Sequence, residues 1–131
     1  MTFKILIVDD DYINRRLLIS FLEQVLYEIT ILESIDGSDA LEVCHKHPDI
    51  QLILLDIEMQ NMDGAEFLKI FKKNQMIPTA PIITVSSNDL RKRELLELGA
   101  DAFVVKPVSQ SKLMDAIIYA QSIKLSDNST P

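Results

Sequence analysis

The sequence predicts a doubly wound α/β fold, in which a parallel sheet carries helices on both of its faces. Short aliphatic runs alternate along the chain with longer segments whose apolar residues recur at helical spacing. Most of these runs are continuous rather than interrupted by polar residues, as strands buried on both faces require. With 131 residues and no sequence repeat, the chain is expected to form one domain with its own core.

Five aliphatic runs are expected to be the strands of the sheet. The first run leads directly into Asp9-Asp10-Asp11, and the third leads directly into Asp56. Strands that alternate with helices pair in parallel through right-handed crossovers, so all the strands should point the same way. The expected strands are residues 4–8, 29–32, 52–55, 82–85 and 102–105.

Five helices are expected to follow the strands, and the fourth, from about residue 89 to residue 98, is short and strongly charged. The apolar positions of the other helices are Ile13, Leu17, Leu18, Phe21, Leu22 and Val25; Ala40, Leu41 and Cys44; Phe67, Ile70 and Phe71; and Leu113, Ala116, Ile117, Ala120 and Ile123. The residues expected to begin or end helices are Asp11, Asp36-Gly37, His47-Pro48, Asp63 with Glu66, Gly99 and Ser109.

Composition and charge argue against several classes of function. The formal net charge of -7 does not suit a nucleic-acid surface, which needs clustered lysine and arginine. The single cysteine, Cys44, cannot form an internal disulfide, and no apolar run approaches the roughly 20 residues of a membrane span. A cytoplasmic protein without a signal peptide is therefore expected. Its domain should span residues 1–124, followed by a flexible tail or linker at residues 125–131.

Polar residues that carry chemistry follow four of the expected strands. The carboxyl ends of parallel strands open onto one edge of the sheet, which is where doubly wound folds bind their ligands. These side chains should therefore meet in one shallow pocket. The residues concerned are Asp9, Asp10, Asp56, Ser86 and Lys106.

The chemistry of these side chains points to a phosphoryl group and a divalent cation. Two carboxylates about 4 Å apart repel by about 4 kcal/mol at an effective dielectric constant near 20, so the cluster needs a proton or a cation. An acidic, all-oxygen site suits Mg²⁺. The chain has only three glycines and no phosphate-binding glycine loop, so a nucleotide is not the expected donor. A carboxylate can itself be the nucleophile, and Asp56, alone at its strand end, is the best candidate.

In these motifs the chain resembles the receiver domain of two-component response regulators, of the single-domain chemotaxis type. The resemblance runs from Lys4 to about Lys124, and its motifs are the aliphatic run before Asp9-Asp10, the segment from Asp56 to Gly64, the strand before Ser86 and the segment that ends in Lys106-Pro107. It implies a flavodoxin-like (βα)5 sandwich with a five-stranded parallel sheet in the order 2-1-3-4-5. It also implies a phosphoacceptor that promotes its own phosphoryl transfer and slow autodephosphorylation, rather than an enzyme.

The resemblance assigns the acceptor and the metal ligands. Asp56 would take the phosphoryl group from a phosphohistidine of a sensor kinase or phosphotransfer protein. Asp10, Asp56 and the backbone carbonyl of Glu58 would bind Mg²⁺, while Asp9 would hold the water shell of the metal.

The resemblance also assigns the switch. Lys106 would contact a phosphoryl oxygen, and its bond to Pro107 is expected to be cis. Ser86 would swing toward the phosphoryl group, and Phe103 occupies the aromatic switch position. Phosphorylation would then change affinity for an unknown partner on the face of helix four, strand five and helix five, or promote a dimer, without contacts to nucleic acid or membrane.

Three features depart from the usual family pattern. Gln60 replaces a common proline, which should loosen the loop after Asp56 without affecting a ligand. Glu58 and Asn88 lie at positions that tune the lifetime of the phosphate, and the acidic Glu58 should slow attack by an anionic donor. The span from Ser86 to Lys106 is about two residues short, so the fourth helix should be trimmed.

Three alternatives remain open. The fold could serve as an interaction module that works without phosphorylation, although all five site residues are present. The chain could be the receiver part of a longer regulator or hybrid kinase. The spacing Asp9-x-Asp11 also imitates the beginning of a haloacid-dehalogenase phosphatase, but such enzymes need a cap and further acidic motifs that this short chain lacks.

Overall fold

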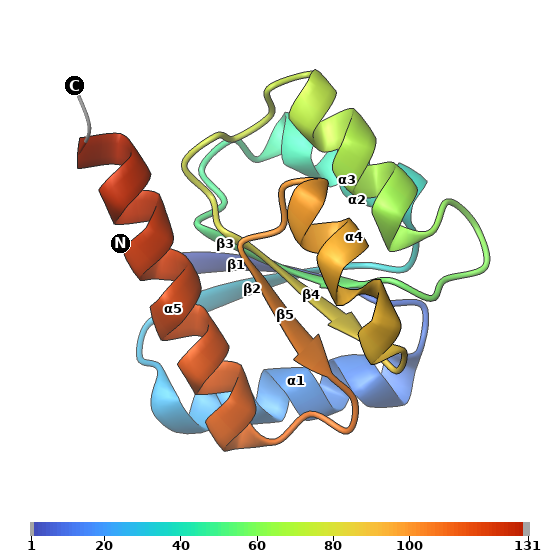
Figure 1. The fold of residues 1–131 in the computed structure, drawn as a ribbon. Coiled ribbons are helices and arrows are strands. Elements are labelled where there is room, and N and C mark those ends of the chain that lie inside the picture. Colours follow the sequence, from blue (N-terminus) through green and yellow to red (C-terminus); the bar gives the residue numbers. More distant parts are fainter. Residues whose placement is uncertain (1, 130–131) are drawn as a thin grey trace.

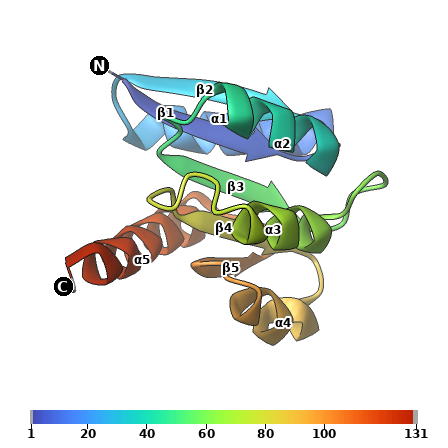
Figure 2. The same ribbon diagram turned by 90° about the horizontal axis from the view of Figure 1, so that it is seen from above.

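The structure, a computed structural model, describes residues 2–129, and of residues 126–129 the backbone alone. Five parallel strands form one sheet (Figure 1), and their order, β2-β1-β3-β4-β5, which can be followed in Figure 2, confirms the predicted fold class and strand order. The strands are β1 (Phe3–Val8), β2 (Ile29–Ser34), β3 (Leu52–Asp56), β4 (Ile82–Ser86) and β5 (Ala102–Val105). The helices are α1 (Tyr12–Val25), α2 (Gly37–Lys46), α3 (Gly64–Lys73), α4 (Lys92–Glu97), which the 3-10 turn η1 (Asp89–Arg91) precedes, and α5 (Gln110–Ser129).

Helices cover both faces of the sheet (Figure 2). Successive residues of a strand point to opposite faces, so each strand supplies side chains to two cores. On one face Ile7 packs with Leu18 of α1 and Leu113 of α5. On the other face Leu6 packs with Phe67 of α3 and with residues of α2 and α4. Every residue of β3 is buried, as its continuous apolar run predicts.

α1 exposes three of the apolar residues that its sequence pattern includes, Ile13, Leu17 and Val25. Leu18 and Leu22 are buried, and Ile19 is buried beside them, but Ile13 is 71% exposed and Leu17 is 45% exposed. Each residue advances about 100° around a helix, so Ile13 and Leu17 lie far around the axis from this buried stripe. Spacing alone does not show which side of the helix faces the sheet.

Helix ends follow the sequence at the N-termini but not at the C-terminus of α5. The last helix was expected to bury residues up to Ile123 and to leave Ser126 to Pro131 as a tail, yet α5 continues to Ser129. No proline or glycine lies between Lys124 and Ser129 to interrupt main-chain hydrogen bonding. The expected tail is therefore helical as far as Ser129, while its last two residues lie outside the described part. The capping side chains that accept main-chain N–H groups are Asp11, Asp36, Asp63 and Ser109.

The fourth helix is short, as its spacing predicts, and consists of the η1 turn followed by α4. Gly99 follows it with a positive φ of 109°, a conformation that glycine adopts without strain. None of the helices within residues 2–129 combines the length and the apolar character that a membrane crossing requires.

Candidate functional site

The parallel register brings the carboxyl ends of four strands together at one edge of the sheet. Asp56, the last residue of β3, pairs with Val85 of β4. β1 ends beside β3, and β5 ends beside β4 at the level of Ser86. The polar residues after these strands are therefore neighbours, as the sequence predicts.

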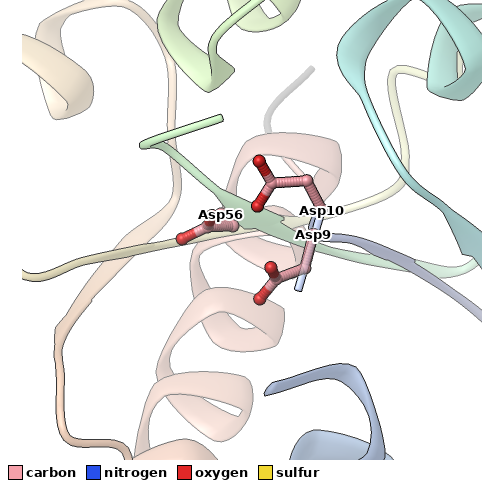
Figure 3. A group of neighbouring side chains, drawn as sticks. All are labelled: Asp9, Asp10 and Asp56. Atoms are coloured by element: carbon pink, nitrogen blue, oxygen red, sulfur yellow. The ribbon is translucent and has the colours of Figure 1, made fainter. Parts of the chain in front are cut away.

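Three of these residues form an acidic cluster (Figure 3). Asp9, Asp10 and Asp56 each offer a carboxylate oxygen, and these oxygens all lie within 4.8 Å of one another. Asp9 and Asp56 are almost fully buried, with 1% and 3% of their surface exposed, whereas Asp10 is exposed. The cluster is thus half open to solvent, and its buried carboxylates repel one another.

Lys106 neutralises part of this charge, because its Nζ lies 2.8 Å from Asp56 Oδ1. Desolvation nevertheless raises the pKa of Asp56 to about 6: the contact with Lys106 lowers it, but the charge of Asp9 raises it again. Burial lowers the pKa of Lys106, yet the facing carboxylates outweigh burial and hold it above its ordinary value. The peptide bond between Lys106 and Pro107 is cis, as expected.

Asp9 is held by its own loop and by a residue that sequence reasoning missed. Burial is the main reason that its pKa is raised, and the main-chain N–H of Asp11 donates to its Oδ1 at 2.9 Å. Arg15 Nη1 donates to the main-chain oxygen of Asp9 at 2.8 Å, and Arg15 Nε pairs with Glu33 at 2.9 Å. Arg15 thereby ties the loop after β1 to the end of β2. Nothing in the local pattern of α1 distinguishes it from a solvent-facing charge.

The acidic cluster fits a hard divalent cation. Asp56 Oδ1 is buried, and the ion pair with Lys106 Nζ at 2.8 Å is its one polar contact among the described residues. Three carboxylates whose oxygens lie within 4.8 Å of one another form the all-oxygen donor set that Mg²⁺ prefers. The main-chain N–H of Gln60 donates to Asp10 Oδ2 at 3.3 Å. The expectation that Gln60 would leave the expected ligands untouched is therefore wrong, because proline would lack this donor.

Ser86 and Phe103 lie at the expected strand positions but do not point into the acidic cluster. Ser86 is fully buried, and its hydroxyl donates to Glu58 Oε2 at 2.8 Å. Phe103 is half-buried on β5 and lines a cavity of about 620 Å³ between α4 and α5, together with Lys92 and Tyr119. Ser86 therefore contacts Glu58 on the loop after β3, and Phe103 faces the cavity between α4 and α5, rather than Asp56.

The chain matches the family described as the response regulator receiver domain over residues 5–118. It is 37% identical over 128 residues to the sensor histidine kinase RcsC of Escherichia coli, a match that covers 95% of this chain and 13% of that protein. It is 33% identical over 109 residues to the two-component response regulator ORR11 of Oryza sativa subsp. indica, covering 82% of this chain and 73% of that protein. The chain thus spans a small part of the kinase and most of the rice regulator.

Two solved structures share the fold over most of both chains. A chain in the CheX-CheY-BeF3-Mg complex from Borrelia burgdorferi is 28% identical, with a TM-score of 0.77 and coverage of 88% of this chain and 87% of that chain. A CheY-like receiver domain protein from Methanospirillum hungatei is 27% identical, with a TM-score of 0.76 and coverage of 97% and 99%. This chain therefore belongs to the family of response regulator receiver domains, the modules that accept a phosphoryl group in two-component signalling.

Proposed function

We propose that Asp56 is the residue that accepts the phosphoryl group, from a phosphohistidine of a sensor kinase or phosphotransfer protein. The observation that carries this assignment is the buried position of Asp56 beside Lys106, within a cluster of carboxylates. A carboxylate oxygen of Asp56 would attack phosphorus and form a P–O bond. The N–P bond would break, and its electron pair would go to the imidazole nitrogen, which then takes up a proton.

For the neighbouring carboxylates we propose the roles that the family resemblance implies. Asp10 and Asp56, with the backbone carbonyl of Glu58, would hold Mg²⁺, and Asp9 would accept hydrogen bonds from its water ligands. The metal supplies charge neutralisation for the transferring phosphoryl oxygens. The protein's own residues position the acceptor: Arg15 braces the loop that carries Asp9, and β3 holds Asp56 at the sheet edge.

Lys106 would move from its ion pair with Asp56 to a phosphoryl oxygen, and Ser86 would donate its hydroxyl to another. Slow hydrolysis of the aspartyl phosphate would then reset the protein. The output proposed here is a change in affinity for a protein partner at the α4–β5–α5 face, where Phe103 lines the cavity. The same face could instead pair two phosphorylated copies.

The receiver module is proposed to span residues 1–124 and to work in the cytoplasm. A second candidate, supported by the match to 13% of a sensor histidine kinase, is that this chain works as the receiver part of a longer protein. The length of the open reading frame in the genome tests this candidate directly.

Incubation with acetyl phosphate and Mg²⁺, followed by intact-mass spectrometry, tests the assignment of Asp56. The wild-type protein should gain one phosphoryl mass, and Asp56→Asn should gain none. The matched control is Asp49→Asn, which alters an exposed aspartate that pairs with Lys4, away from the acidic cluster. Label that persists in Asp56→Asn, or a wild-type protein that stays unmodified, would contradict the proposal.

A further inference from the structure

The side chain of Glu58 is tied to the loop after β4 by several donors. Ser86 Oγ donates to Glu58 Oε2 at 2.8 Å, and the main-chain N–H of Ser87 donates to Oε1 at 3.0 Å. Ser87 Oγ lies 3.2 Å from Oε1, and Arg91 Nη1 lies 3.6 Å from Oε2. Both carboxylate oxygens are thus engaged by residues that lead from β4 into η1 and α4.

These contacts join two parts of the receiver that phosphorylation must coordinate. Glu58 lies two residues after Asp56, on the loop that the acceptor strand enters. Ser86 is the residue proposed to donate to the phosphoryl group, and Arg91 is the last residue of the turn before α4. Arg91 also approaches Asp63 at 3.9 Å, so a single guanidinium bridges both ends of the loop after β3.

We propose that Glu58 is a latch that holds the Ser86 hydroxyl in the unphosphorylated protein and couples its release to α4. A serine hydroxyl has one proton, so Ser86 cannot donate at full strength to Glu58 and to a phosphoryl oxygen at the same time. The phosphoryl group must therefore compete with the Glu58 carboxylate for this hydroxyl. When Ser86 leaves, Glu58 keeps only Ser87 and Arg91, and the end of β4 loses its shortest hydrogen bond to Glu58.

The latch rests on the proposed function, because it assumes that Ser86 donates to a phosphoryl group on Asp56. It differs from simple repulsion between Glu58 and an anionic donor. That repulsion depends on the charge at position 58 and not on whether the side chain is long enough to contact the Ser86 hydroxyl. Aspartate and glutamine separate the two explanations at this position. Asp keeps the charge but is one methylene too short to reach Ser86, whereas Gln keeps an acceptor oxygen within reach and carries no charge.

The test is a titration of the full chain with beryllofluoride and Mg²⁺, a mimic of the phosphoryl group, monitored by fluorine NMR. Glu58→Asp and Glu58→Ala should bind beryllofluoride about three- to tenfold more tightly than the wild type, and Glu58→Gln should change less. The side chain of Glu58 is 38% exposed, so water competes for its carboxylate and limits the expected gain in beryllofluoride affinity to this range. Glu94→Gln, which removes another partner of Arg91 without affecting Ser86, should bind as the wild type does.

Two outcomes would overturn the latch alone. One is that Glu58→Asp binds like the wild type while Glu58→Gln matches Glu58→Ala, which is the signature of charge repulsion. The other is that the β-carbon of Ser86 keeps its chemical shift in unphosphorylated Glu58→Asp, because the latch requires the Ser86 hydroxyl to lose its acceptor in that variant. A wild-type protein that does not bind beryllofluoride at all would instead overturn the proposed function, and the latch with it.

Discussion

Replacing Asp56 with asparagine should stabilise the metal-free protein at neutral pH while it abolishes phosphorylation. Burial raises the pKa of Asp56 from 3.8 to about 6. The folded protein therefore binds this proton more tightly than the unfolded chain does. The stabilising contribution of Asp56 is fully present below pH 3.8 and is lost as the pH rises through about 6. At about 1.4 kcal/mol for each tenfold change in proton affinity, the ionised carboxylate costs about 3 kcal/mol at about pH 7.5, and asparagine mimics the protonated form.

Urea denaturation in EDTA measures this effect. Asp56→Asn should be about 3 kcal/mol more stable than the wild type at about pH 7.5, and about half of that advantage should remain at about pH 5. Asp49→Asn is the control of opposite sign, because a hydrogen bond from Lys4 lowers the pKa of that exposed carboxyl. An Asp56→Asn variant that is no more stable than the wild type, or an advantage that does not change with pH, would refute the reasoning.

Mg²⁺ adds a second arm to the same experiment. A cation bound at the acidic cluster stabilises only the folded state, and it needs the carboxylate of Asp56. Adding Mg²⁺ should therefore reduce the difference in the free energy of unfolding between the wild type and Asp56→Asn at about pH 7.5. A difference that Mg²⁺ leaves unchanged would argue against a metal site that includes Asp56.

Three further substitutions test the surroundings of the cluster. Gln60→Pro removes the N–H that donates to Asp10 Oδ2 at 3.3 Å, so calorimetry should show about twofold tighter Mg²⁺ binding. Gly64→Ala would place a Cβ 2.7 Å from the main-chain oxygen of Asp56, so urea denaturation should show a loss of about 1–3 kcal/mol in stability. Lys106→Met removes a charge that lowers the pKa of Asp56, so the rate of phosphorylation by acetyl phosphate should fall on the order of a hundredfold and its pH midpoint should rise.

Each of these substitutions has its own check. Gln60→Ala keeps the main-chain N–H and should bind Mg²⁺ as the wild type does; equal affinities for the alanine and proline variants would remove the role of that donor. Lys112→Met removes a lysine that lines the cavity near α5 and should leave the phosphorylation rate unchanged. A stable Gly64→Ala protein would mean that the loop after Asp56 shifts more easily than its packing indicates.

The sequence predicts the candidate site well because the site is built from strand ends. A continuous aliphatic run identifies a buried strand, and the residue that follows it must leave the core at a known edge of the sheet. Asp9, Asp56 and Lys106 are therefore placed together once the strands are known to be parallel. The short fourth helix and the capping aspartates follow from equally local signals.

Other features could not be read from local patterns. The exposed side of α1 depends on how the helix rotates against the sheet, so the spacing of Ile13 and Leu17 did not reveal their exposure. Gln60 in place of a proline predicted only a looser loop, but its main-chain N–H also donates to Asp10 Oδ2. Arg15 has its partners on other elements, which only the folded chain brings within reach.

The sequence by itself determined the alternation of strands and helices and the types of side chain at the sheet edge, because both depend on neighbours along the chain. The tertiary structure alone decided that Ser86 donates to Glu58, that Lys106 contacts Asp56 and that the pKa of Asp56 rises to about 6. These properties depend on burial and on distances between separate strands and loops. A linear pattern contains neither quantity.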